Sequence, residues 1–157
     1  MSKVSIGLSV AKIDKIVRTR APIAEAFGFL ADFTTTEQWD PGTVRTERAA
    51  GAGGVGTIYA NTSRFFGRTT RLTYVVQAYE PDTRIVLRGE NGTVVARDTI
   101  TFTPTTDGGT MVRYQAEFEL KGLARLAAPL LAHAFARLGN AGAAQMREVL
   151  DRLESAD

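Results

Sequence analysis

The stretch Leu123 to Leu153, LARLAAPLLAHAFARLGNAGAAQMREVLDRL, is the one segment long and periodic enough to form a full-length helix. Proline lacks the N–H of the helical hydrogen bond, so Pro129 predicts a short lead-in over Leu123 to Ala127 and a main helix that starts near Pro129. At about 100° per residue, one face alternates large and small residues. This face comprises Leu131, Ala134, Leu138, Ala141, Gly142, Gln145, Val149 and Leu153. The alternation lets a sheet approach closely at some turns and leaves room for a ligand at others.

Length and composition fit one globular domain. The chain has 157 residues, of which 44% are hydrophobic and 23% are charged, and neither a linker nor a repeat divides it. A chain of this size can bury a substantial core. We expect a single domain over residues 11–155, preceded by an N-terminal arm over residues 1–10.

Charge and cysteine content exclude several classes of function. The 19 Lys and Arg residues barely outnumber the 17 Asp and Glu residues and are scattered, which argues against a nucleic-acid partner. Without cysteine, the chain has no disulfide, thiolate nucleophile or sulfur-ligated metal. No apolar run reaches membrane-spanning length and no signal-peptide pattern is present, so we expect a cytoplasmic protein without stable membrane insertion. A homodimer remains open.

The N-terminal third predicts a strand followed by two short helices. Residues Lys12 to Thr19 are rich in Ile and Val and form the strand, and Pro22 suits the first turn of the first helix. The buried stripe of this helix comprises Ile23, Ala26, Phe27 and Leu30. Thr34 and Glu37 fit a capping box at the start of the second helix, which ends at Trp39-Asp40-Pro41-Gly42.

Six strands follow, separated by clusters of Gly, Pro, Asn and Asp that suit consecutive antiparallel hairpins. Their expected ranges are Thr43 to Arg48, Thr57 to Phe65, Thr69 to Tyr79, Arg84 to Glu90, Thr93 to Thr103 and Thr110 to Leu120. The last strand alternates most cleanly, with Val112, Tyr114, Ala116, Phe118 and Leu120 on one face. Arg113, Gln115, Glu117 and Glu119 form the other face, so one side of the sheet is covered and one faces water.

Several local signatures resemble the polyketide cyclase/dehydrase and lipid-transport family of the START-like superfamily, which includes the birch-pollen allergen. They are Arg20 to Phe27, Leu30-Ala31-Asp32-Phe33, Trp39-Asp40-Pro41-Gly42, Gly54-Val55-Gly56-Thr57, Leu72-Thr73-Tyr74 and Asp107-Gly108-Gly109-Thr110. The resemblance covers roughly Ile13 to Leu153.

The resemblance implies an α+β helix-grip fold, in which a curved seven-stranded antiparallel sheet wraps around the long C-terminal helix. It says little about a reaction, because the superfamily includes cyclases, aromatases and carriers of lipids and hormones. The sequence contains no catalytic motif that matches one of these activities, so no catalytic residue follows from the resemblance.

The glycine-rich run Gly51 to Gly56 fits the letters G-x-G-x-x-G of a dinucleotide-binding motif. Such a site requires a helix directly after the glycines, whereas Thr57 to Ser63 is β-branched, aromatic and polar and predicts a strand. We therefore interpret the run as a mobile hairpin loop at the mouth of a cavity, and expect no cofactor.

His133 is the only histidine, so any histidine-based catalytic or metal site would depend on it. On the helical projection it lies far from the apolar face, which predicts a solvent-facing side chain. A zinc site would also lack a second nitrogen or sulfur ligand, so we expect no metal.

Asp98 is the strongest candidate for chemistry. It shares its side of the strand with Ala96, Ile100 and Phe102, so its carboxylate is predicted to point at the covered face. A buried charge needs a partner, and Arg88 in the neighbouring strand is one possibility. Alternatively, the carboxyl group accepts a hydrogen bond from a ligand or transfers protons with a raised pKa; a structural or ligand-orienting role is favoured over catalysis.

Several polar residues share the predicted interior of the sheet. Tyr59, Asn61 and Ser63 lie on one face of a strand, Tyr74 lies between two apolar residues, and Tyr114 lies on a covered face. Ordinary core packing explains any one of them, but together they favour a cavity with apolar walls and a few fixed polar groups. Trp39 is either a lid residue or a core anchor. The predicted ligand-binding residues are Trp39, Tyr59, Asn61, Tyr74, Arg88, Asp98, Tyr114, Leu131, Ala134 and Leu138.

The sequence is compatible with three functions. The first is binding, and possibly transport, of a small hydrophobic or aromatic molecule between the sheet and the long helix. The second is a polyketide cyclase or dehydratase that uses the same pocket, with Asp98 or a tyrosine relaying protons. The third is a protein-interaction module, for which Phe65 and Phe66 at a hairpin tip are the only hint.

Overall fold

The computed structural model describes residues 10–65 and 67–155. Seven strands form one antiparallel sheet in the order β1-β7-β6-β5-β4-β3-β2. The strands are β1 (Val10–Thr19), β2 (Thr43–Ala50), β3 (Ile58–Phe65), β4 (Arg68–Glu80), β5 (Arg84–Glu90), β6 (Val94–Pro104) and β7 (Thr110–Leu120). The helices are α1 (Ile23–Ala31), η2 (Phe33–Thr35), α2 (Thr36–Trp39), η3 (Gly122–Ala127) and α3 (Ala128–Ser155).

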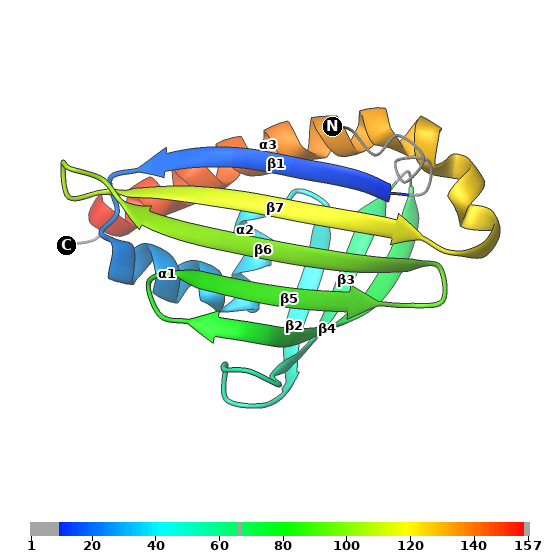
Figure 1. Cartoon of the computed structure of the whole chain (residues 1–157), viewed down its shortest axis with the longest axis horizontal. Helices are drawn as coiled ribbons and strands as arrows, with labels where there is room; N and C mark the ends of the chain where they lie inside the picture. The colour runs from blue at the N-terminus through cyan, green and yellow to red at the C-terminus, as the bar shows by residue number, and fades with distance from the viewer. Residues whose placement is uncertain (1–9, 66, 156–157) are drawn as a thin grey trace, which may run out of the picture.

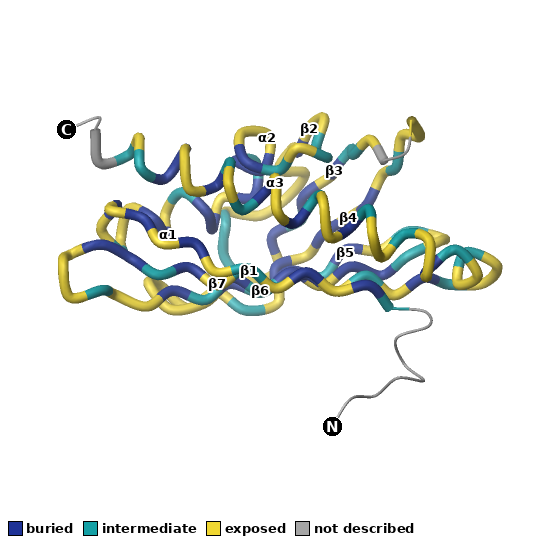
Figure 2. Tube along the Cα trace, turned by 90° about the horizontal axis from the view of Figure 1, so that it is seen from above, coloured by how far each residue is buried: buried dark blue, intermediate teal, exposed yellow. Residues whose placement is uncertain are grey.

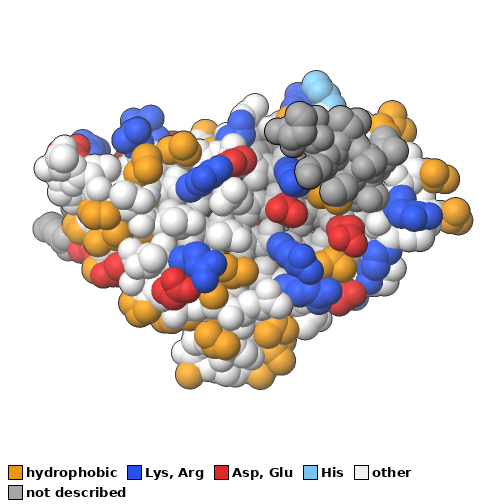
Figure 3. Space-filling view, viewed as in Figure 1, with side chains coloured by type: hydrophobic (Ala, Val, Ile, Leu, Met, Phe, Trp, Pro, Cys, Tyr) orange, Lys and Arg blue, Asp and Glu red, His pale blue; other side chains and the backbone are white. Residues whose placement is uncertain are grey.

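The sheet curves around α3, which runs along its concave side (Figures 1 and 2). The predicted helix-grip architecture is therefore confirmed, with the two short helices between β1 and β2. Lys/Arg and Asp/Glu side chains are interspersed on the face seen in Figure 3, in line with the small net charge. No helix in the described ranges is long and apolar enough to cross a membrane.

Helix α3 begins where Pro129 predicted, after the short helix η3. The buried face was only partly predicted, because Ala141 is exposed while Phe135, Met146 and Leu150 are buried. The buried face also contains Gly139, at which an added Cβ would lie 2.9 Å from Cγ2 of Ile13 in β1. The absence of a side chain at this position thus lets α3 lie against the edge of the sheet.

The predicted capping box at α2 is wrong. The Thr34 hydroxyl and N–H both donate to Asp32, which caps η2, and α2 begins two residues later, at Thr36. The Glu37 carboxylate instead accepts a 2.9 Å hydrogen bond from the backbone N–H of Thr46. Glu37 therefore fastens α2 to strand β2 rather than closing the first turn of a helix.

Helix α1 fills one end of the concave side of the sheet. Phe27 on α1 packs edge to face against Phe102 of β6 and Tyr79 of β4, at centroid distances of 5.2 and 5.3 Å. The residues around them form the main hydrophobic core. Aromatic side chains therefore fill this end of the concave side.

Two predictions concern residues outside the described part of the chain. The N-terminal arm falls almost entirely within residues 1–9. The apolar hairpin tip falls on Phe66 and on the side chain of Phe65, which also lie outside the described residues.

Candidate functional site

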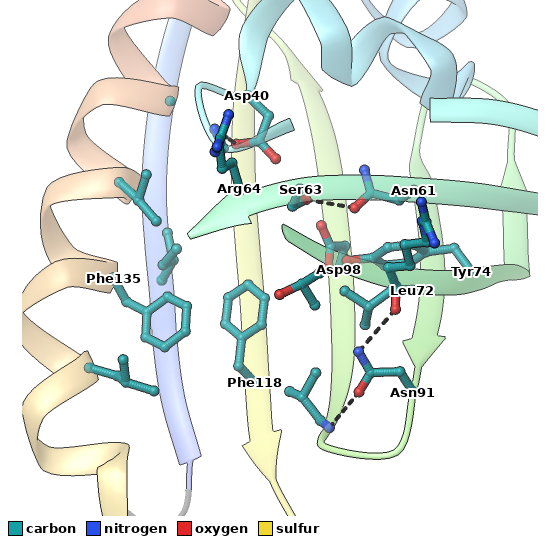
Figure 4. Close-up of a pocket in the computed structure, with 18 of the residues that line it drawn as sticks. Asp40, Asn61, Ser63, Arg64, Leu72, Tyr74, Asn91, Asp98, Phe118 and Phe135 are labelled. Carbon is teal, nitrogen blue, oxygen red and sulfur yellow. Dashed lines mark hydrogen bonds between the residues drawn. The ribbon is translucent and has the colours of Figure 1, made fainter. Parts of the chain in front are cut away.

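A cavity of about 490 Å³ lies between the concave face of the sheet and α3. Its apolar wall comes from both layers, as Figure 4 shows for Leu72, Phe118 and Phe135. The Phe118 and Phe135 rings stack with their centroids 4.6 Å apart and an interplanar angle of 10°. Further wall residues are Ile13, Phe33, Val94, Leu120, Leu131, Leu138, Gly139 and Gly142.

The mouth of the cavity is formed by exposed residues at the β3–β4 hairpin and the β5–β6 turn. They are Arg64, Arg68, Thr69, Arg71 and Thr93. This basic mouth was not predicted from the sequence, because charged residues at hairpin ends are ordinarily solvated. Only the pairing of β3 with β4 shows that they gather around one opening.

Asp98 lies at the inner end of the cavity and is 3% exposed. Its Oδ2 accepts a 2.9 Å hydrogen bond from the Tyr114 hydroxyl, whereas Oδ1 has no partner among the described residues. Burial raises the pKa of Asp98 to about 7, against the lowering effect of the Tyr114 hydrogen bond. At neutral pH this carboxyl group can therefore accept or donate a hydrogen bond to a molecule in the cavity.

Trp39 is buried and also lines the cavity. Its ring packs edge to face on Tyr114, with the centroids 5.3 Å apart. The indole Nε1–H, like Asp98 Oδ1, has no partner among the described residues. Trp39 is thus a core anchor that also offers an unused hydrogen-bond donor, and buried polar atoms without partners call for an explanation.

Tyr74 completes the polar end of the cavity. Its ring packs on Phe33 with the centroids 4.9 Å apart, and burial raises its pKa well above the ordinary value. Burial likewise raises the pKa of Tyr114. Both phenols are therefore neutral hydrogen-bond donors throughout the physiological pH range.

Asn61 lines the cavity but is satisfied by neighbouring side chains. Its amide nitrogen donates to the hydroxyls of Thr46 and Thr43 at 2.9 and 3.3 Å, and its oxygen accepts from Ser63 at 2.7 Å. This network fixes the Ser63 hydroxyl at the cavity surface (Figure 4). Asn61 therefore positions its neighbours more than it offers a free group to a ligand.

Asp40 is a second acidic residue of the cavity, and it was not predicted from the sequence. Its carboxylate accepts hydrogen bonds from Gly42 N–H and the Thr43 hydroxyl, which hold the turn between α2 and β2. Burial raises the pKa of Asp40, and its charge in turn helps to raise that of Asp98.

Seven of the ten predicted binding residues line this cavity, and three do not. Tyr59 is buried in the core against Phe33. Ala134 lies on α3 between the lining residues Leu131 and Phe135 but does not reach the cavity. Both residues were wrongly predicted to line the cavity, because each shares a strand face or helix face with residues that do line it.

Arg88 is also a correction, because it lies on the opposite face of the sheet from Asp98. Leu87, its neighbour in β5, is the cross-strand partner of Asp98, so Arg88 points the other way. Arg88 pairs instead with Glu90 at 2.8 Å. The buried partner of Asp98 is the Tyr114 hydroxyl, not a cation.

The remaining candidates stay outside the cavity. His133 is exposed, as predicted, and no group of three metal-ligating side chains occurs within residues 10–65 and 67–155. The Gly51–Gly56 run connects β2 to strand β3, as expected from the β-branched residues after it. It lies at the start of β3, whereas Asn61, Ser63 and Arg64 near the end of β3 line the cavity, so it is not at the mouth.

Comparisons with known proteins agree with this architecture. The model of the family described as polyketide cyclase / dehydrase and lipid transport matches residues 11–156. A sequence search of curated proteins found no match.

Solved structures share the fold at low sequence identity. The Zhui aromatase/cyclase from Streptomyces sp. R1128 has a TM-score of 0.75 at 13% identity, covering 91% of this chain and 94% of its own. A START superfamily protein from Mycobacterium smegmatis has a TM-score of 0.75 at 13% identity, covering 90% and 98%. Ara h 8.0201 has a TM-score of 0.57 at 18% identity, covering 87% and 97%.

Proposed function

The chain belongs to the polyketide cyclase/dehydrase and lipid-transport family, and from this premise we propose that it binds a small hydrophobic or aromatic molecule in the cavity between the sheet and α3. The observation that carries the proposal is a cavity of about 490 Å³ lined by two residues, Trp39 and Asp98, that each have a buried polar atom without a partner among the described residues. Ligand pockets typically measure about 300–1,000 Å³ and combine apolar walls with a few fixed polar groups.

The two buried atoms without partners, Trp39 Nε1 and Asp98 Oδ1, indicate which polar groups suit a ligand of this cavity. Trp39 Nε1 is a donor, and Asp98 Oδ1 accepts when ionised and donates when protonated. We therefore expect the ligand to carry a hydroxyl or carbonyl group at its inner end on an otherwise apolar body. The stacked Phe118 and Phe135 rings suit a flat aromatic body along the wall.

Binding can be tested with N-phenylnaphthylamine, a neutral aromatic dye that fluoresces in apolar surroundings. Mass spectrometry of the purified protein would at the same time identify a compound that copurifies with it. Leu138→Trp fills the cavity from α3 and is expected to weaken dye binding at least tenfold. Ala141→Trp, one turn away on the exposed side of α3, is the matched control and should bind as the wild type does. Equal binding by both variants would reject the cavity as the site.

A second function, that of a polyketide-type cyclase or dehydratase, is favoured by one specific observation. The pKa of Asp98, at about 7, suits a general acid or base at neutral pH. In such a reaction the carboxylate takes a proton from a methylene group between two carbonyls, and the resulting carbanion forms a carbon–carbon bond to a third carbonyl. The proton then passes to the new alkoxide. Loss of that hydroxyl together with an adjacent proton releases water and leaves a double bond.

The two functions are separated by Asp98→Asn, which keeps the shape of the side chain but removes its titration. If Asp98 is a general base, kcat on a poly-β-ketone substrate falls by about 10²–10⁴-fold while affinity changes little. If the protein only binds, no turnover is seen with the wild type, and the substitution alters affinity alone. Equal loss of kcat and affinity would argue against the catalytic role.

A further inference from the structure

Three of the most exposed large hydrophobic side chains in the described chain lie close together in sequence. Leu123, Leu126 and Leu130 are 86%, 78% and 80% exposed. Leu123 and Leu126 are three residues apart in the 3-10 helix η3, where side chains at this spacing eclipse. Leu130 follows one helical turn later at the start of α3. The three therefore form one continuous row, here called the leucine ridge.

The leucine ridge lies beside the mouth of the cavity. The backbone N–H of Lys121, just before η3, donates a 2.7 Å hydrogen bond to the carbonyl of Thr93, a mouth residue. Leu131, next to the ridge in sequence, lines the cavity. Consecutive residues lie about 100° apart around a helix, so Leu130 points to the surface while Leu131 points to the ligand space.

The charged residues of the segment that carries the ridge are all positive. From Lys121 to Arg147 there is no Asp or Glu, and Lys121, Arg125 and Arg137 lie within this segment. Arg125 and Arg137 are exposed, whereas Lys121 pairs with Glu90 at 2.8 Å. Arg68 and Arg71 at the mouth add further positive charge nearby. Figure 3 shows hydrophobic side chains beside Lys/Arg side chains at the end of the molecule where Figure 1 places the start of α3.

We propose that the leucine ridge docks the protein onto the surface of an anionic lipid bilayer, with the mouth of the cavity at that surface. Exposed aliphatic side chains flanked by Lys and Arg are the pattern of helices that lie in the membrane interface. Aliphatic side chains enter the acyl boundary while the cations contact lipid phosphates, which accounts for both features of the ridge.

A second copy of the chain fits the ridge less well. In a two-fold dimer through this surface, the same cationic segment of each copy would face that of the other. The like charges of Arg125 and Arg137 would then oppose association. A protruding row of leucines also lacks the aromatic anchors that dominate most protein interfaces.

The proposal can be tested by co-sedimentation of the full chain with vesicles. One set contains phosphatidylcholine alone, and the other contains phosphatidylcholine with about one-third phosphatidylglycerol. We expect binding to the anionic vesicles, weakening by about tenfold or more on neutral vesicles or in high salt. Absence of binding to anionic vesicles would overturn the proposal.

Two variants and one control locate the surface. Leu126→Ser/Leu130→Ser and the charge reversal Arg125→Glu/Arg137→Glu are each expected to reduce binding to anionic vesicles by at least about tenfold. The control Ile16→Ser/Val55→Ser changes two residues that are 58% and 68% exposed and lie away from the ridge, so it should bind as the wild type does. Equal binding by the leucine variant and the control would overturn the proposal, as would a concentration-dependent dimer that only the leucine variant abolishes. Because no cavity ligand is added, the result is independent of the dye-binding test.

Discussion

The Tyr114 hydroxyl on β7 donates a 2.9 Å hydrogen bond to Oδ2 of Asp98 on β6, and among the described residues this neutral donor is the partner of a carboxyl group that is buried at the cavity. No cation offsets the burial of Asp98 in the described chain, since Arg88 points to the other face of the sheet and pairs with Glu90. A single neutral donor is too little to keep a buried carboxylate ionised at its ordinary pKa. We therefore expect the protonation of Asp98 to respond both to pH and to a ligand bound in the cavity.

The first prediction concerns stability against pH. The native protein keeps a proton on Asp98 up to about pH 7, whereas the unfolded chain loses it near the ordinary value of 3.8. Between these values the native state binds more protons, so the free energy of unfolding falls as the pH rises. For this group the total fall is roughly 4 kcal/mol at most, complete above pH 7.

Urea unfolding at a series of pH values measures this effect. Asp98→Asn should flatten the profile between pH 4 and 7, because the amide does not titrate. The control Asp14→Asn removes an exposed carboxylate whose pKa is lowered by its hydrogen bonds from Arg113, so it should leave the slope in this range unchanged. Parallel profiles for the wild type and Asp98→Asn would contradict the raised pKa.

The second prediction removes the hydroxyl at the other end of the pair. Tyr114→Phe leaves Asp98 without its donor, so the pKa of Asp98 should rise further and the fall in stability should extend to higher pH. We expect a loss of about 1–3 kcal/mol at pH 7. Tyr79→Phe, at a partly exposed tyrosine remote from the cavity, is the control and should cost much less. An unshifted pH profile for Tyr114→Phe would count against the hydrogen bond.

Local patterns were sufficient to predict the sheet. The bounds of Arg84 to Glu90 and Thr110 to Leu120 match the observed strands β5 and β7, because alternation and turn residues are encoded within a few positions. The buried face of α3 was predicted less well. Which side of a helix is covered depends on where the sheet lies, and this long-range packing placed Phe135 inside and Ala141 outside.

The features of the candidate site that depend on local sequence patterns were also predicted, and those that depend on long-range packing were not. Alternation in β6 correctly predicted that Asp98 points inward, but its partner depended on strand register, which aligns Asp98 with Leu87 and Ala116. The alternation of Leu87, Arg88 and Gly89 in β5 was the signal that could have excluded Arg88. The unused Trp39 Nε1 could not be predicted, because it depends on the packing around a single atom.

The third prediction compares two glycines on one helix. Alanine is a better helix former than glycine by about 1 kcal/mol, so Gly142→Ala, whose Cβ would meet nothing closer than 3.7 Å, should stabilise the protein. At Gly139 an added Cβ would lie 2.9 Å from the Ile13 Cγ2, a branched side chain with little freedom to move. We expect Gly139→Ala to destabilise by about 1 kcal/mol despite its better helix propensity. Thermal unfolding of the pair measures the difference, and similar stabilisation by both would mean that α3 is not held against β1 at this point.

The fourth prediction concerns Gly89 and the position of Tyr74 in the cavity. The two residues are cross-strand partners, and a Cβ on Gly89 would lie 2.7 Å from Cε1 of the Tyr74 ring. The ring thus covers a strand glycine, and Gly89→Ala must push it into the cavity or away from Phe33. We expect a loss of about 1–3 kcal/mol in the free energy of unfolding, together with weaker binding of N-phenylnaphthylamine.

Gly92→Ala, where a Cβ meets nothing within 4 Å, is the control and should bind the dye unchanged. If Gly89→Ala bound the dye as the wild type does and kept full stability, the Tyr74 ring would not be fixed by this contact, and its place in the cavity would need another cause.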